Sequence, residues 1–104
     1  MAAPWSPPKK AEDWEGVFAL EDAANPGQIK VNPTLALGDA KISKDGGAEA
    51  NLASLPVVEP STTRGVKIVA TGTEMTMDKG YIYLHDQTVP PEWNDLWIAI
   101  QTTA

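Results

Sequence analysis

Proline- and glycine-rich turn sequences divide this chain into short segments, and they limit its possible folds more than any other feature. The clearest are Asn25-Pro26-Gly27, Asp45-Gly46-Gly47 and Val89-Pro90-Pro91. Between them, apolar and polar residues alternate with period two, as in half-buried strands, and helical periodicity is almost absent. About seven strand candidates separated by such turns predict an all-β protein, a small antiparallel β-sandwich of immunoglobulin-like type. A small β-barrel is the alternative.

The expected strands can be placed along the chain. They cover residues 14–20, 28–31, 39–43, 48–52, 66–70, 81–86 and 93–100. The proline-flanked segment 55–60 suits an edge or a crossover, because proline lacks an amide donor. A single helical turn, capped by Thr71 or Thr73, is expected to hold Glu74 and Met75.

One hairpin, from Asp39 to Leu52, is expected to set the register of the sheet. Asp45-Gly46-Gly47 provides the positive-φ positions that a tight reversal needs. Strand alternation places Ala40 and Ile42 inward, and it places Lys41 and Ser43 in water. The hairpin tip is therefore predicted to be a turn and not a site that holds a ligand.

The domain organisation follows from length and from the proline distribution. At 104 residues the chain has room for one domain, predicted over 13–104. Residues 1–12 are expected to form an extended proline-rich N-terminal arm, because Pro4, Pro7 and Pro8 disfavour helix. Its Trp5 either docks on a neighbouring subunit or belongs to a floppy terminus. No signal-peptide core and no membrane-spanning apolar run is evident, so a soluble protein without membrane contact is expected.

Composition argues against several classes of function. The chain has no cysteine, which excludes disulfides, thiolate metal sites and cysteine catalysis. Its formal charge is −6, and its basic residues are scattered, so no nucleic-acid partner is expected. The acidic residues show no EF-hand pattern, and Gly46-Gly47 lacks the lysine of a phosphate loop. We therefore expect no metal and no cofactor.

Catalysis is not expected, because the single histidine lacks a partner in the local sequence. A general base needs a nucleophile or an orienting carboxylate within hydrogen-bonding reach. Asp86 follows His85 directly, but neighbouring residues of a strand point to opposite faces. Carboxylates such as Asp95 are expected to be isolated and solvated. We therefore predict that the protein is not an enzyme.

Large aromatic residues are expected on the outer face of two strands near the C-terminus. If the aliphatic residues of 81–86 and 93–100 point inward, the aromatic residues between them point outward. Exposed aromatic clusters are typical of interface cores. They are covered either by another subunit or by the arm or the 52–60 segment of the same chain. The predicted interface residues are Trp5, Tyr81, Tyr83, His85, Trp93 and Trp97.

Several short motifs carry a family resemblance. They are Asn32-Pro33-Thr34-Leu35, the run from Asp39 to Ala48, Asn51-Leu52 through Leu55-Pro56, Val66-Lys67-Ile68, Glu74-Met75 and the closing segment 93–102. Together they resemble a module of small structural proteins of tailed bacteriophages, over about residues 14–102. The Thr71–Met75 segment departs from the usual pattern, because Gly72 stands where helix formers are more common.

The resemblance implies a non-enzymatic virion structural protein that is assembled in the host cytoplasm. The first expectation is a capsid decoration or accessory protein, a homo-oligomer that contacts the major capsid protein. A tail, baseplate or fibre-attachment adaptor that contacts tail components is the second. From a different class, a carbohydrate- or receptor-binding module would stack sugars on the outer aromatic residues.

Overall fold

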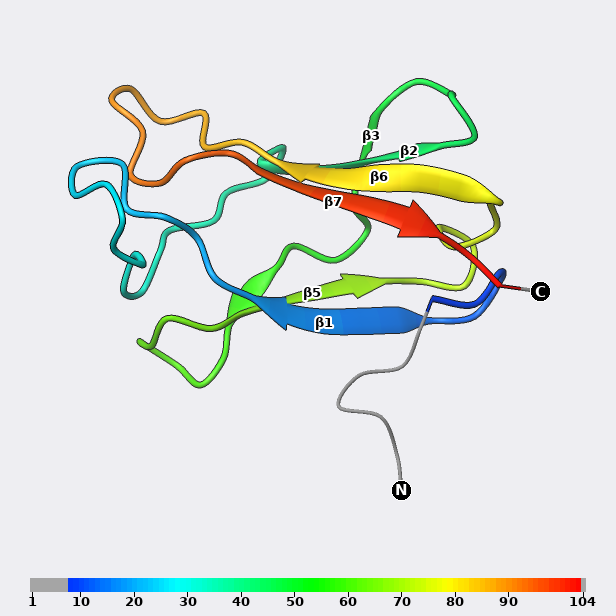
Figure 1. Ribbon diagram of the computed structural model, residues 1–104, viewed down its shortest axis with the longest axis horizontal. Helices are drawn as coiled ribbons and strands as arrows, with labels where there is room; N and C mark the ends of the chain where they lie inside the picture. Colours follow the sequence, from blue (N-terminus) through cyan, green and yellow to red (C-terminus); the bar gives the residue numbers. More distant parts are fainter. Residues whose placement is uncertain (1–7, 104) are drawn as a thin grey trace.

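Seven β-strands form two antiparallel sheets within residues 8–103, the part of the chain that the computed structural model describes (Figure 1). They are β1 (Trp14–Phe18), β2 (Ala40–Lys44), β3 (Ala50–Asn51), β4 (Val57–Val58), β5 (Val66–Ala70), β6 (Lys79–Leu84) and β7 (Leu96–Gln101). One sheet has the order β1-β5-β4 and the other the order β3-β2-β6-β7. No helix is assigned in these residues, and none is therefore long and apolar enough to cross a membrane.

The order of the strands confirms the predicted sandwich. In the immunoglobulin pattern, β1, β5 and β4 correspond to strands B, E and D, and β3, β2, β6 and β7 to C′, C, F and G. No ladder joins the two sheets in the described residues, so they are two layers and not a closed barrel. β1 and β7 are edge strands of different layers (Figure 1), and residues of both line one groove.

The core lies between the two layers and is built from alternate residues of each strand. Its fully buried members from the strands include Val66, Ile68, Ala70, Ile82, Leu84 and Ile100, as the alternation predicted. Loops add large residues to the same cluster, namely Leu20, Leu52, Met75, Met77 and Trp93. The loops therefore contribute much of the volume of the core, which alternation along strands does not predict.

The predicted hairpin turn is present between β2 and β3. Asp45 and Gly46 both have positive φ angles, 49° and 77°, and the Gly47 amide donates to the Lys44 carbonyl at 2.8 Å. The expectation that Ser43 faces water is wrong, because Ser43 is buried. Its hydroxyl donates to the Gly47 carbonyl at 2.7 Å, so the turn folds over the side chain that stabilises it.

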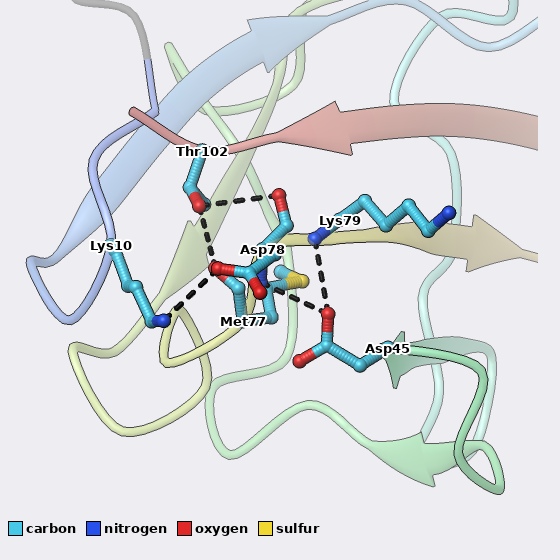
Figure 2. Close-up of polar contacts among 6 residues, drawn as sticks. All are labelled: Lys10, Asp45, Met77, Asp78, Lys79 and Thr102. Atoms are coloured by element: carbon cyan, nitrogen blue, oxygen red, sulfur yellow. Dashed lines mark hydrogen bonds and ion pairs between the residues drawn. The ribbon is translucent and has the colours of Figure 1, made fainter. Parts of the chain in front are cut away.

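The tip of this hairpin also joins distant parts of the chain (Figure 2). Asp45 Oδ1 accepts hydrogen bonds from the backbone amides of Asp78 and Lys79, at 3.0 and 3.2 Å. These amides hold the pKa of Asp45 below its ordinary value, the Lys79 amide having the larger effect. Thr102, just after β7, bonds to the Asp78 carbonyl, and Lys10 forms an ion pair with the Asp78 carboxylate at 3.0 Å. The Asp45 carboxylate therefore has a structural role, because it links the hairpin tip to the start of β6.

A capped turn follows β5, as the sequence suggested. Thr71 Oγ1 accepts from the Glu74 amide at 3.2 Å, and Glu74 Oε1 accepts from the Thr71 amide at 2.9 Å. This reciprocal pair is the hydrogen-bond pattern of a capping box. The other oxygen of Glu74 accepts from the Ala53 amide, which ties the loop after β3 to the turn. The turn places Met75 in the core.

The expectation of a strand over 28–31 is wrong. This segment makes a single isolated bridge, between Glu21 and Ile29, and no ladder. Pro33 follows closely and cannot donate to a sheet, and the Asn32 amide bonds to the Thr63 carbonyl instead. Residues 8–12 of the predicted arm are hydrogen bonded to the sandwich, because the Lys10 and Ala11 amides donate to the Thr103 and Met75 carbonyls. The rest of the predicted arm, residues 1–7, lies outside the described residues.

Candidate functional site

The outer face of the four-stranded sheet carries four of the six predicted interface residues. Tyr81 and Tyr83 lie on β6 and Trp97 on β7, where Tyr83 is directly opposite Trp97 and Tyr81 is opposite Ala99. His85 lies just after β6, two residues beyond Tyr83, and therefore has the same parity as Tyr81 and Tyr83. Ile82 and Leu84 between them are fully buried, so alternation along β6 is kept and sends Tyr81, Tyr83 and His85 outward. Trp97 shares their face because it pairs with Tyr83. We call Tyr81, Tyr83, His85 and Trp97 the aromatic face.

The four rings contact one another in a row. Trp97 stacks on Tyr81 with ring centroids 3.9 Å apart and an interplanar angle of 17°. Trp97 also lies 6.0 Å from Tyr83 in a tilted arrangement, and the rings of Tyr83 and His85 are 6.0 Å apart. Although it stacks on Tyr81, Trp97 remains 58% exposed. An indole this exposed is an apolar surface that a partner could cover.

Two carboxylates hold the tyrosine hydroxyls. Tyr81 donates to Glu49 Oε2, and Tyr83 donates to Asp95 Oδ2. Each hydrogen bond raises the pKa of its tyrosine above 10.0, with partial desolvation acting in the same direction. Both phenols therefore stay neutral. Each ring is held by the hydrogen bond of its hydroxyl group as well as by stacking. The aromatic face is rigid before any partner binds.

Asp95 also orients the histidine, which corrects the expectation that this carboxylate is isolated. Asp95 Oδ1 lies 2.7 Å from His85 Nδ1. Desolvation acts to raise the pKa of Asp95, but the hydrogen bonds from Tyr83 and from His85 outweigh it, and the pKa is lowered. In the described residues no serine or threonine hydroxyl hydrogen bonds to His85. The pair has an orienting carboxylate but no nucleophile at the ring.

Trp93 does not belong to the aromatic face, so this part of the interface prediction is wrong. Trp93 is only 1% exposed, and its Nε1 donates to the Thr34 carbonyl at 3.1 Å. The ladder of β7 begins at Leu96, and Trp93 lies in the preceding loop, bridged to Asp22. Strand parity therefore does not apply to it, and its ring belongs to the buried core cluster.

The remaining predicted interface residue, Trp5, lies outside the described residues. Sequence reasoning missed Glu49 and Asp95 as members of the site. Asp95 has the same parity as Trp97, which indicated the face of the sheet on which it lies. Alternation along one strand cannot show that the Asp95 side chain reaches Tyr83 and His85 on the neighbouring strand. Glu49 lies in the loop before β3, where no periodic signal exists.

A shallow cleft of about 330 Å³ adjoins the aromatic face. Its lining includes Lys41, Glu49, Tyr83, His85 and Gln87. Two other carboxylates near this end of the sheet are buried and have structural roles. Asp39 Oδ2 accepts from the Ala36 amide, and Asp86 accepts from the amides of Thr88 and Glu92. No group of three or more potential metal ligands occurs in residues 8–103.

Comparison of the chain with known protein families, curated proteins and solved structures gave no match. The candidate site is therefore interpreted from its own geometry: a rigid, partly exposed aromatic row, one carboxylate at each phenol, and an oriented histidine at one end.

Proposed function

We propose that this protein is a non-enzymatic structural component of a tailed-bacteriophage particle, and specifically a capsid decoration or accessory protein. In this proposal the aromatic face binds a neighbouring subunit, either a second copy or the major capsid protein. The observation that carries it is the exposure of Trp97 on a rigid row of aromatic rings. Exposed aromatic residues of this kind are enriched at the centres of protein interfaces.

The geometry supports a binding role in a second way. Stacking and the hydrogen bonds to Glu49 and Asp95 already restrict the rings. Little side-chain entropy is then lost when a partner covers them, and this entropy loss is a main cost of association. A decoration protein that binds the assembled shell and not its separate subunits stabilises the shell by mass action. A net charge of −6 adds long-range selection against acidic partners.

The test compares variants for binding to particles that lack the protein. Trp97→Ala should weaken binding about tenfold or more, the usual effect of losing a central interface aromatic residue. Val57→Ala is the matched control, because Val57 is 52% exposed and lies on β4 of the other sheet, and it should bind like the wild type. If Trp97→Ala is folded and binds as tightly as Val57→Ala, the aromatic face is not the interface.

Copy number per particle separates the head from the tail. Quantitative gel analysis should find roughly hundreds of copies for a decoration protein, because shell proteins follow the symmetry of the head. About a dozen copies or fewer would instead support a tail, baseplate or fibre-attachment adaptor.

One observation favours carbohydrate binding as a second candidate. The cleft beside the aromatic face brings Lys41, Glu49 and the Asp95-bound His85 close to the Tyr83 ring. A ring platform with converging polar groups is what a sugar site requires. Binding on a glycan array that is lost in Trp97→Ala and Tyr83→Ala would support this candidate, and an array without any signal would exclude the glycans tested.

A further inference from the structure

An apolar groove of about 490 Å³ lies between β1 and β7, and we call it the edge groove. Its lining includes Trp14, Phe18, Ile98 and Ile100, and Glu15 is its only charged residue. β1 and β7 are edge strands, so each has one side without a strand partner in residues 8–103. Exposed sheet edges pair readily with another chain, and proteins usually cover them.

Residues that point into the core remain partly exposed along the edge groove. Ile98 on β7 pairs with Ile82 on β6, so the two share the inner face of their sheet, yet only Ile82 is fully buried. In the other sheet Phe18 pairs with Val66, and again the residue of the central strand is fully buried and that of the edge strand is not. The described residues therefore leave the core incompletely covered on this side.

A buried hydrogen-bond donor in the lining lacks a partner. Trp14 is only 9% exposed, and its Nε1 has no acceptor among the described residues. Buried donors without an acceptor are costly, and they are rare in native proteins. A molecule that fills the edge groove is therefore expected to bring an acceptor as well as apolar surface. A backbone carbonyl is such an acceptor.

The backbone of β7 offers hydrogen-bonding groups along its free edge. The Thr102 amide bonds to the Asp78 carbonyl on the β6 side, whereas the Thr103 amide bonds to the Pro8 carbonyl on the opposite side. Backbone groups alternate in direction along a strand of an antiparallel sheet. Three residues of β7 therefore direct their amides and carbonyls to the free edge, namely Trp97, Ala99 and Gln101.

The chain itself shows that this edge accepts another strand. Lys9 forms a parallel bridge with Thr103, just beyond β7, and both backbone groups of Thr103 are hydrogen bonded there. Continuing this parallel ladder would require an amide at position 8 that donates to the Gln101 carbonyl, and Pro8 has no amide. Within residues 8–103, the edge groups of residues 97–101 are therefore left without a partner.

We propose that the free edge of β7 is a docking site for an extended segment of a partner protein. The segment adds a strand beside residues 97–101 by bonding to the backbone groups that point to the edge. Its side chains alternate in direction, so every second one enters the edge groove and packs on Phe18 and Ile98. In this mode of recognition the backbone hydrogen bonds supply affinity, and the groove supplies specificity for apolar residues at alternate positions.

The chemistry of the edge groove restricts the partner segment. Five strand residues span about 17 Å, so about two or three apolar side chains enter the groove. Glu15 and the net charge of −6 favour a neutral or basic segment over an acidic one. The same charge opposes a second copy of this chain as the partner. The edge groove lies between the layers and the aromatic face on the outside of one of them, so this docking does not rest on the binding role proposed above.

Nuclear magnetic resonance of the full-length, isotope-labelled protein tests the proposal, with a synthetic peptide as the probe. The probe alternates valine and threonine between two terminal lysines, and the control peptide contains the same residues with the valines grouped together. The alternating peptide should shift the indole signal of Trp14 and slow hydrogen exchange of the Ala99 and Gln101 amides about tenfold at saturation. The control peptide should change these rates by less than about twofold.

Three outcomes of this titration would overturn the proposal. One is that the alternating peptide at about 1 mM, the range of weak complexes, leaves the Trp14 and Ala99 signals unchanged. Another is that its shifts are confined to the aromatic face. The third is that the same signals shift with protein concentration alone, which would assign the edge groove to a second copy.

A matched pair of variants tests the backbone contact. Ala99→Pro removes an amide that points to the free edge, and proline is tolerated on edge strands, whereas Ala99→Ser keeps the amide. Ala99→Pro should weaken binding of the alternating peptide about five- to tenfold, the effect of losing one backbone hydrogen bond, and Ala99→Ser should stay within about twofold of the wild type. Equal affinities in the two folded variants would overturn the assignment to the β7 edge. If Ala99→Pro does not fold, the exchange rates of the wild-type protein decide the question.

Discussion

Replacing each of two nearby tryptophans by alanine separates the core from the aromatic face. Trp93 is 1% exposed and donates a hydrogen bond to the Thr34 carbonyl, whereas Trp97 lies outside the core and stacks on Tyr81. We predict that Trp93→Ala severely destabilises the sandwich and that Trp97→Ala has a small effect. The two substitutions remove the same atoms, so their difference measures only the environment.

The expected magnitudes follow from burial. A buried indole removes about 150–250 Å² from water, and at about 25 cal/mol per Å² this gives about 4–6 kcal/mol, an upper estimate. Trp-to-Ala substitutions in cores cost about 3–5 kcal/mol, so we expect about 4 kcal/mol for Trp93→Ala. Loss of the Trp97 stack should cost about 1 kcal/mol. Trp93→Phe retains most of the volume but leaves the Thr34 carbonyl unpaired, and it should cost about 1–2 kcal/mol.

Urea unfolding followed by far-ultraviolet circular dichroism is the appropriate assay, because tryptophan fluorescence changes with the substitutions themselves. A protein of this size is stable by about 5–15 kcal/mol, so Trp93→Ala should lose about a quarter or more of the free energy of unfolding. Its melting temperature should fall by about 15–30 °C, and that of Trp97→Ala by about 4–8 °C. Equal losses in the two variants would refute the assignment of Trp93 to the core and of Trp97 to the surface.

Three further predictions concern the backbone, acid stability and the site. Gly80→Ala should destabilise the protein by about 2 kcal/mol or more in urea unfolding, because its Cβ would clash with the Ser43 carbonyl oxygen. Desolvation acts to raise the pKa of Asp86, but hydrogen bonds outweigh it and lower the pKa below 3.8. The ionised carboxylate therefore stabilises the fold above this pH, and its contribution is lost as the pH falls through the pKa of Asp86 in the folded state. Asp86→Asn should consequently flatten the loss of stability between pH 5 and pH 2, about the range over which aspartates titrate. Alkaline titration by ultraviolet absorbance should place the pKa of Tyr83 above 10.0, and Asp95→Asn should lower it toward that value.

Alternation and turn chemistry predicted the elements in which local sequence and burial agree. β5 and β6 bury every second residue, and the Asp45-Gly46 turn has the positive φ angles that its residue types favour. The segment 28–31 has the same apolar alternation as a strand. It forms one bridge only, because a strand also requires a neighbour with free backbone groups, and this depends on the fold as a whole.

The errors in the candidate site have the same origin. The parity argument for Trp93 assumed that the last strand begins there, but the ladder begins three residues later, at Leu96. Parity predicted the face on which Tyr83 and Trp97 lie, since both are within ladders. It could not predict the contacts of Asp95 and Glu49, because these depend on which strands are neighbours and on the register between them.

The two outer faces of the sandwich differ in a way that supports the binding role proposed above. The outer face of the three-stranded sheet also alternates, yet it carries Val17 and Val57 on either side of Lys67, which pairs with Glu59 at 3.4 Å. Small aliphatic residues and a surface ion pair are sufficient for a strand facing water. The aromatic face instead has large rings in mutual contact, held by carboxylates that fix their orientation without burying them. A solvated sheet face gains only the stability of the ring stack, about 1 kcal/mol, from this arrangement. A binding surface would gain contact area and a lower entropic cost as well.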